Sequence, residues 1–372
     1  MAAGAVREGR GCRSGCCGGH LLLAVRRISA LLSLIALGYH KIESFLFFID
    51  EVLWIVGDGY LFSFFFHSLI IILEVFQMKN TVFTGAATAI VTPLTKDGID
   101  YEQFGRLIEW QISEGIAAIV AVGTTGEGST LDDREHKEAI KFCVEKVAGR
   151  VPVIAGTGSN DTAYAIELSK YACEVGADAL LLVTPYYNKA TQKGLIKSFL
   201  AVADVSTKPC ILYNVPSRTG CNLLPETVAE LAKHEKIVAI KEASGNISQI
   251  AKLISLCGDS IDVYSGNDDQ IVPIMALGGK GVISVLSNVV PTETAEMCRY
   301  MLEGNTAKGA ELQLKYIELI DALFCEVNPI PVKAACAAMG YCDNYLRLPL
   351  TPMEPQNEAR LLAAMKNAGV KF

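Results

Sequence analysis

Short apolar runs recur between residues 86 and 300, and a longer stretch with apolar residues at helical spacing follows each of them. The runs are ATAIVTP (87–93), AAIVAVG (117–123), VPVIAGTG (151–158), ALLLVTP (179–185), PCILYNVP (209–216), IVAIKEAS (237–244), IDVYSGND (261–268) and GKGVISV (279–285). Nearly continuous apolar strands that alternate with amphipathic helices are typical of a parallel sheet covered on both faces. Eight such units predict an α/β fold, a closed (β/α)₈ TIM barrel.

A doubly wound parallel sheet is the alternative that this alternation leaves open. Its usual fingerprint is a glycine-rich turn after the first strand, which lets the backbone approach a dinucleotide. The nearest match, GTGSND, has Asp161 where the third glycine is required. The sequence therefore favours the barrel.

The alternation of apolar runs with helical stretches stops at about residue 301. Residues 309–324, 328–340 and 354–369 have helical patterns separated by proline and glycine. We therefore predict a catalytic barrel over residues 78–301 and a C-terminal helical region over 302–372.

The first 77 residues differ in kind from the rest. Two apolar runs, residues 28–40 and 59–73, are both shorter than the ~20 residues that a membrane-spanning helix needs, and the first follows two arginines as in a signal peptide. We interpret residues 1–77 as a leader or translated upstream sequence outside the barrel, with Met78 as the functional start. A membrane anchor is the alternative.

Composition excludes several classes of function. The net charge of −7 gives no reason to expect nucleic-acid binding. The 12 cysteines contain no CxxC pair, and most of the later ones lie in apolar segments, which indicates reduced thiols in a cytoplasmic protein. After residue 77 only His136 and His234 remain, so a histidine-rich metal site or a Ser-His-Asp triad is not expected.

Polar residues gather where the predicted strands end. The stretches are GTTGE (123–127), TPYYN (184–188), YNVPSRTG (213–220), IKEASG (240–245) and SGND (265–268). Any one of them is explained by turns, packing or surface charge. In a barrel, however, all five meet at the C-terminal face, where the active sites of this fold lie.

Lys241 ends the apolar strand IVAIK. A buried ammonium loses hydration, which favours the neutral and nucleophilic amine. Such an amine condenses with a ketone to an imine, from which an enamine nucleophile forms without a metal. Tyr213 on the neighbouring strand is placed to shuttle protons. A surface pair of Lys241 with Glu242 is not expected, because consecutive strand residues point to opposite faces.

The motifs GTTGE, TPYYN, YNVPSRTG, IKEASGN and NPIPVK together resemble the dihydrodipicolinate synthase family. The resemblance runs from about residue 80 to the C-terminus. It implies condensation of pyruvate with L-aspartate-4-semialdehyde, a step of lysine and diaminopimelate biosynthesis, with no cofactor and no metal. It also implies a homotetramer built as a dimer of tight dimers.

The resemblance assigns four catalytic residues. Lys241 matches the Schiff-base lysine, and Tyr213 matches the tyrosine that shuttles protons during imine formation and cyclisation. Thr124 matches the residue that links this tyrosine to Tyr187, which in the family is contributed across the tight dimer interface.

Four further positions match residues that hold substrate. Three of them are Thr125 and the backbone around Gly266 and Ile283. Arg218 matches the arginine that receives the carboxylate of the semialdehyde, a task suited to a planar bidentate donor.

One departure concerns inhibition by lysine. Inhibited members of the family carry a glutamate on the helix after the third strand, where this chain has Tyr164. A second inhibitor-site position, often histidine, is Asp133 here, although Asn160 and His136 fit the pattern. A bound lysine therefore lacks a carboxylate partner for its ammonium, and we expect weak or absent feedback.

Three alternatives stay open. Related pyruvate-lysine aldolases, such as N-acetylneuraminate lyase or a 2-keto-acid aldolase, share the lysine and the tyrosine; Arg218 and the paired threonines favour the synthase. A non-catalytic, membrane-tethered binding protein is supported only by residues 1–77. A pyridoxal-phosphate enzyme lacks a dedicated acidic partner for the pyridinium.

Overall fold

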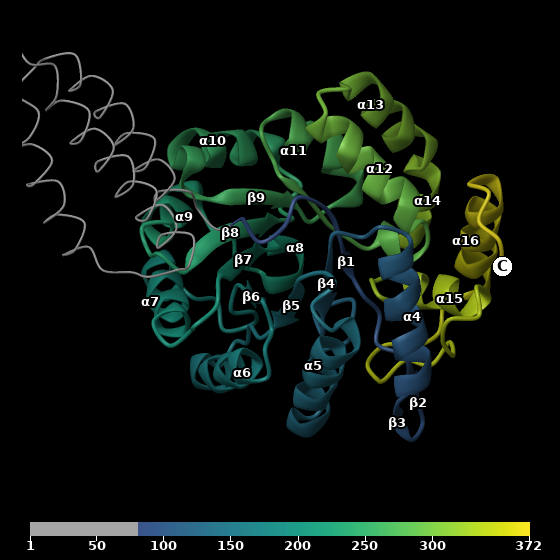
Figure 1. The fold of residues 1–372 in the computed structure, drawn as a ribbon, viewed down its shortest axis with the longest axis horizontal. Helices are drawn as coiled ribbons and strands as arrows, with labels where there is room; N and C mark the ends of the chain where they lie inside the picture. Colours follow the sequence, from purple (N-terminus) through teal and green to yellow (C-terminus); the bar gives the residue numbers. More distant parts are fainter. Residues whose placement is uncertain (1–80) are drawn as a thin grey trace, which may run out of the picture. The chain divides into compact units, whose positions relative to one another are not determined.

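The computed structural model describes residues 81–372 (Figure 1). The predictions made for residues 1–77, a leader or a membrane anchor, lie outside these residues. They stay predictions, which N-terminal sequencing of the natural protein tests.

Eight parallel strands form a closed barrel in the order β1-β10-β9-β8-β7-β6-β5-β4 (Figure 1). Their bounds are β1 Gly85–Ala89, β4 Ala118–Ala121, β5 Val153–Gly156, β6 Ala179–Val183, β7 Cys210–Asn214, β8 Ile237–Glu242, β9 Asp262–Ser265 and β10 Gly281–Ser284. Each lies within or overlaps one of the eight apolar runs. The predicted (β/α)₈ barrel is therefore confirmed, and the doubly wound alternative is wrong.

Helices follow the strands and surround the barrel (Figure 1). They are α4 Tyr101–Ser113, α5 Asp133–Val147, α6 Thr162–Glu174, α7 Gln192–Ala203, α8 Pro216–Thr219, α9 Pro225–Leu231, α10 Ile247–Cys257, α11 Ile271–Ala276 and α12 Pro291–Leu302. A small hairpin, β2 Leu94–Thr95 and β3 Gly98–Ile99, lies between β1 and α4. Between residues 81 and 372, no helix combines the length and the apolar character needed to cross a bilayer.

Side chains at the helix starts explain where several helices begin. Asp100 caps α4 by accepting a hydrogen bond from the backbone N–H of Gln103, and Asp132 and Glu135 form a reciprocal capping box on α5. Asp161 accepts from the N–H of Ala163 at the start of α6 (2.9 Å). The residue that breaks the dinucleotide fingerprint is thus a helix cap, worth about 1 kcal/mol.

The core has two layers, because strand residues point alternately inward and outward. Along β4, Ala118 and Val120 belong to the cluster inside the barrel, whereas Ile119 and Ala121 pack under the helices. Near the opposite end of the barrel from the polar clusters, the Tyr264 ring stacks on Phe83 at 4.2 Å. The inner cluster is thus filled by side chains, and the barrel is a packed core.

The barrel closes where β1 meets β10. Gly85 pairs with Gly281 there, and a Cβ on Gly281 would lie 1.8 Å from the carbonyl oxygen of Gly85. Beyond the seam, the Asn288 amide accepts from the N–H of Val91 (3.2 Å) and donates to the carbonyl of Ala89 (2.8 Å). The seam therefore requires glycine, and one asparagine fixes the exit of β1.

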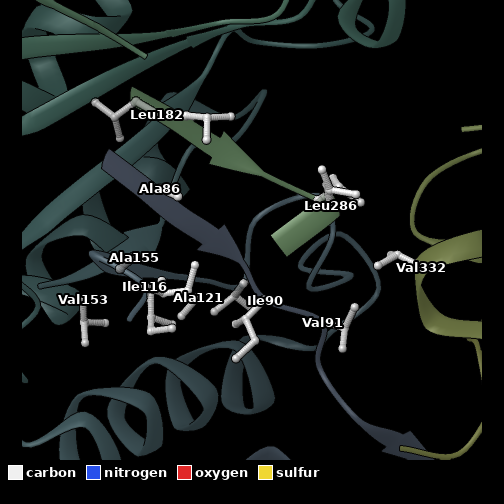
Figure 2. Packing of buried hydrophobic residues seen from close by; sticks show 14 of the residues in the cluster. Ala86, Ile90, Val91, Ile116, Ala121, Val153, Ala155, Leu182, Leu286 and Val332 are labelled. Atoms are coloured by element: carbon white, nitrogen blue, oxygen red, sulfur yellow. The ribbon is translucent and has the colours of Figure 1, made fainter. Parts of the chain in front are cut away.

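Four helices follow the barrel: α13 Thr306–Lys315, α14 Ile317–Leu323, α15 Ile330–Ala338 and α16 Pro355–Asn367. The pattern over 309–324 predicts one helix, but the structure has two, which meet at the buried Tyr316. Val332 of α15 packs in the same cluster as Val91 and Leu286 (Figure 2). The C-terminal helical extension is therefore confirmed, and it shares the core of the barrel.

Candidate active site

Lys241 and Tyr213 lie next to each other at the C-terminal ends of β8 and β7. The two residues are register partners in the parallel sheet. The Lys241 Nζ lies 4.4 Å from the centroid of the Tyr213 ring. Lys241 is 5% exposed and Tyr213 is 6% exposed. The strands thus hold an amine and a phenol together, nearly shielded from water.

Glu242 does not pair with this lysine at the surface. It is fully buried and accepts hydrogen bonds from the amide of Asn214 (3.1 and 3.2 Å) and from the N–H of Ser244 (2.7 Å). Burial raises the pKa of Glu242, and these hydrogen bonds partly offset that rise. The expected alternation of neighbouring side chains along β8 therefore holds.

Gly266 lies directly beside the lysine side chain. A Cβ at Gly266 would be 3.1 Å from both Cγ and Cε of Lys241 and 2.7 Å from Cβ of Ala243. Ile283, on β10, is fully buried and belongs to the same inner cluster as Tyr213. The structure therefore places Gly266 against the Lys241 side chain and Ile283 in the core inside the barrel.

A second buried carboxylate, Asp268, lies near Lys241. Its oxygens accept from the Ser284 hydroxyl (2.6 Å) and from the N–H groups of Val285 (3.0 Å) and Leu286 (2.9 Å). Burial raises the pKa of Asp268, while these hydrogen bonds and the Lys241 charge act in the opposite direction. Sequence reasoning identified SGND only as a polar strand end and assigned this carboxylate no role.

A cavity of about 350 Å³ opens at the ends of β4 to β7. Thr124, Tyr213 and Arg218 are among its lining residues, as is Tyr186. Three of the predicted site residues, one from the end of β4 and two from the end of β7, thus face one space. This volume is suited to small substrates.

Two predicted catalytic residues, Lys241 and Tyr187, are not among the residues that line this cavity. Lys241 contacts Tyr213, which does line it, whereas no such contact of Tyr187 is seen among residues 81–372. Tyr187 is 89% exposed, and its backbone has φ +73°, a value that is strained for a residue with a side chain. The neighbouring Tyr186 lines the cavity instead. Within one chain, therefore, the Tyr187 side chain is exposed to solvent and does not line the cavity that Tyr213 and Thr124 line.

The GTTGE turn contacts the C-terminal region. Glu127, which has φ +55°, forms an ion pair with Lys333 of α15, and both side chains are completely buried. The second carboxylate oxygen of Glu127 accepts from the N–H of Arg347 (3.3 Å). Sequence reasoning used NPIPVK only for its family resemblance and missed this pair.

Asn328 connects two of the predicted substrate residues. Its amide nitrogen donates to the hydroxyl of Thr125 (3.1 Å), and its backbone carbonyl accepts from the Arg218 guanidinium (3.0 Å). Thr125 is 2% exposed. The C-terminal region therefore belongs structurally to the site.

Two of the predicted inhibitor-site positions line the cavity: Tyr164, which departs from the lysine-inhibited pattern, and His136, which fits it. Burial lowers the pKa of His136, whose Nε2 is 2.8 Å from the carbonyl oxygen of Gly156. The Asp133 carboxylate, which interacts with Tyr164, pairs with Lys137 (2.9 Å). This carboxylate beside Tyr164 thus already has a cationic partner.

Among residues 81–372, no group of three or more His, Cys, Asp or Glu side chains is arranged to hold a metal ion. Seven of the nine cysteines of this range are buried. The site that the structure assembles consists of an amine, hydroxyls, a guanidinium and backbone groups.

Comparison with known proteins agrees with this arrangement. The model of the "Dihydrodipicolinate synthetase family" matches residues 82–368. A 4-hydroxy-tetrahydrodipicolinate synthase of Acetivibrio thermocellus is 55% identical over 79% of this chain and 100% of its own length.

Two solved structures extend the comparison. Dihydrodipicolinate synthase from Aquifex aeolicus is 45% identical and superposes with a TM-score of 0.76 over 78% of this chain and 100% of that one. A structure described as the first monomeric dihydrodipicolinate synthase variant is 42% identical, with a TM-score of 0.77 over 78% and 98%. The resemblance carried by the five motifs is confirmed, and the chain belongs to the dihydrodipicolinate synthetase family.

Proposed function

We propose that the protein is a lyase that condenses pyruvate with L-aspartate-4-semialdehyde, as a 4-hydroxy-tetrahydrodipicolinate synthase does in lysine and diaminopimelate biosynthesis. The observation that carries this proposal is the buried amine of Lys241 beside the Tyr213 ring. Family membership and the names of the relatives support the same activity.

The chemistry begins at Lys241. Its nitrogen adds to the keto carbon of pyruvate, the carbonyl oxygen leaves as water, and a protonated imine remains. Loss of a methyl proton gives an enamine, whose carbon attacks the aldehyde of the second substrate. In the cyclisation that follows, the semialdehyde's amino nitrogen displaces the lysine from the imine carbon and frees it for another cycle.

Each of these steps needs a proton carrier. Tyr213 is the assigned one, because its ring lies beside the amine and its side chain lines the cavity. Thr124, also on the cavity wall, is assigned to relay protons between Tyr213 and Tyr187. A relay of hydroxyl groups suits a step in which protons both enter and leave.

The remaining residues are assigned to substrate binding. Thr125 and the backbone around Gly266 and Ile283 hold the keto acid beside Lys241. Arg218 receives the carboxylate of the semialdehyde, because a guanidinium on the cavity wall offers a planar pair of donors.

The proposal is tested by comparing substrates. The purified protein is incubated with pyruvate and either aspartate-semialdehyde or N-acetylmannosamine, and in the cleavage direction with N-acetylneuraminate. We expect turnover with aspartate-semialdehyde only. Cleavage of N-acetylneuraminate at a comparable kcat/KM would instead assign the related aldolase activity.

Cytoplasmic localisation stays a prediction that rests on the cysteine pattern.

We further propose a homotetramer made of two tight dimers, in which each Tyr187 completes the partner's site. The exposed Tyr187 side chain supports this arrangement. Dilution to isolated monomers, followed by sedimentation and assay in parallel, is expected to remove nearly all activity. A fully active monomer would contradict the shared site, and the existence of a monomeric variant among the similar structures makes this measurement necessary.

Feedback by lysine is expected to be weak or absent. Tyr164 offers no carboxylate for the ammonium of a bound lysine, and Asp133 is already paired with Lys137. Activity is measured at fixed pyruvate and semialdehyde while lysine is raised to about 1 mM, a typical scale for metabolite affinities. A sharp fall of activity below that concentration would refute the prediction.

A further inference from the structure

Asn328 is buried between two residues of the site, although it lies outside the barrel strands. It is 5% exposed and precedes α15. Its side-chain nitrogen is 3.1 Å from Oγ1 of Thr125, and its backbone oxygen is 3.0 Å from Nη2 of Arg218. One residue thus contacts both predicted substrate-binding side chains, through different atoms.

The direction of the first contact restricts the threonine hydroxyl. An amide nitrogen only donates hydrogen bonds, whereas a hydroxyl has one donor and two acceptor sites. When Thr125 accepts from Asn328, its own proton cannot point at this neighbour. The proton remains available for an anionic acceptor, and hydrogen bonds to a charged acceptor are the stronger kind.

The amide oxygen of Asn328 is buried and has no hydrogen-bond partner among residues 81–372. Rotating the amide by half a turn would place this oxygen against Thr125, where it would accept the hydroxyl proton. The two orientations of the amide have the same shape. In the first, the hydroxyl proton of Thr125 remains available for the substrate; in the second, Asn328 accepts it. Because substrate binding depends on this proton, kinetic measurements distinguish the two orientations.

We propose that Asn328 is a positioning residue that keeps the Thr125 hydroxyl in the donor orientation, aimed at the carboxylate of the keto acid. The inference rests on the proposed function, which assigns Thr125 to pyruvate. It adds a specific role for the C-terminal region: binding of the first substrate depends on a residue beyond the barrel.

The contact with Arg218 allows a selective test. Because Arg218 is held by the backbone oxygen of Asn328, that bond does not depend on the side chain. Side-chain variants of Asn328 should therefore change the KM for pyruvate and leave the KM for aspartate-semialdehyde near its original value. A purely structural disturbance at the mouth of the barrel would move both.

The experiment is a double-mutant cycle of Asn328→Ala and Thr125→Val, with borohydride trapping of pyruvate as a second readout. Asn328→Ala is expected to raise the KM for pyruvate about tenfold, the scale of a hydrogen bond to a charged group. In the Thr125→Val background, which has no hydroxyl to orient, the same change is expected to have little further effect. If the KM increase of the double variant equals the product of the increases in the two single variants, the proposal is overturned.

Asn328→Asp tests the direction of the bond. An aspartate at this position accepts the hydroxyl proton of Thr125. The KM of the Asn328→Asp variant for pyruvate should therefore rise at least as much as that of the Asn328→Ala variant. An Asn328→Asp protein with the original KM would overturn the proposal, because it would mean that Thr125 donates to residue 328.

Asn344→Asp is the matched control. It puts the same charge into the same C-terminal segment, at a residue whose amide oxygen is likewise buried. The KM of this variant for pyruvate should not change.

Failure of this inference is distinguishable from failure of the proposed function. In the first case the unaltered protein turns over both substrates and only the variants behave differently; in the second it does not turn them over at all.

Discussion

Replacing Lys241 by alanine is expected to lower turnover at least about 10³-fold, the scale on which enzymes lose activity with their nucleophile. Alanine has no nitrogen that could add to the keto carbon of pyruvate, so neither the imine nor the enamine can form at this position. Arginine is expected to be equally inactive, because its guanidinium stays protonated. Turnover is measured by product formation from pyruvate and aspartate-semialdehyde.

Borohydride reduction with pyruvate gives an independent measurement of the same prediction. The unaltered protein should gain a covalent adduct, and peptide mapping should locate it at Lys241. The matched control is Lys236→Ala, just before the start of the same strand, where the side chain is 36% exposed. Lys236→Ala should keep both activity and adduct; a Lys241→Ala protein that still forms the adduct would contradict the assignment.

Replacing Lys333 by methionine is expected to cost about 3–5 kcal/mol of unfolding free energy. The change leaves the Glu127 carboxylate buried without its cation, since both side chains of the pair are completely buried. The substitution keeps the length and apolar volume of the side chain, so that loss of packing adds little. Urea denaturation followed by circular dichroism measures the effect.

The control for this prediction is an ion pair of the same kind at the surface. Lys252 pairs with Glu226, and both side chains are more than half exposed. Lys252→Met should therefore cost less than about 1 kcal/mol. In addition, Glu127→Gln combined with Lys333→Met should recover part of the lost stability. Equal losses in the Lys333 and Lys252 variants would show that burial does not set the cost.

The barrel could be predicted from the sequence because its strands are buried on both faces. Each strand then appears as a short apolar run, and eight such runs without a dinucleotide fingerprint favour a closed barrel over a doubly wound sheet. The position of Lys241 followed from the same signal, since a lysine in an apolar strand is unusual enough to demand an explanation. Its contact with Tyr213 follows from the parallel register of β7 and β8.

The same signal is present at Lys333, but it does not identify the partner. The helix IPVKAACAA carries one lysine among apolar residues, as the strand IVAIK does. Its partner is far away along the chain, at Glu127, and helical periodicity contains no information about such distant pairs. For the same reason Asn328 could not be linked to Thr125 without the fold.

Tyr187 shows a different limit of prediction from the sequence. The family resemblance assigns Tyr187 a role through the TPYYN motif, but the motif does not say which of its two tyrosines faces the cavity. The structure places Tyr186 there and leaves Tyr187 exposed. If Tyr187 acts across a subunit boundary, as we propose, the structure of one chain does not contain the contact that it makes.

The seam between Gly85 and Gly281 has a consequence for biosynthesis on the ribosome. Translation proceeds from the N-terminus, so β1 leaves the exit tunnel long before β10, its second neighbour, has been made. Until then the growing sheet is open, with two unpaired edges of apolar strands that invite association with other chains. Nascent polypeptides that end before residue 281 should therefore depend on chaperones more than the finished enzyme does.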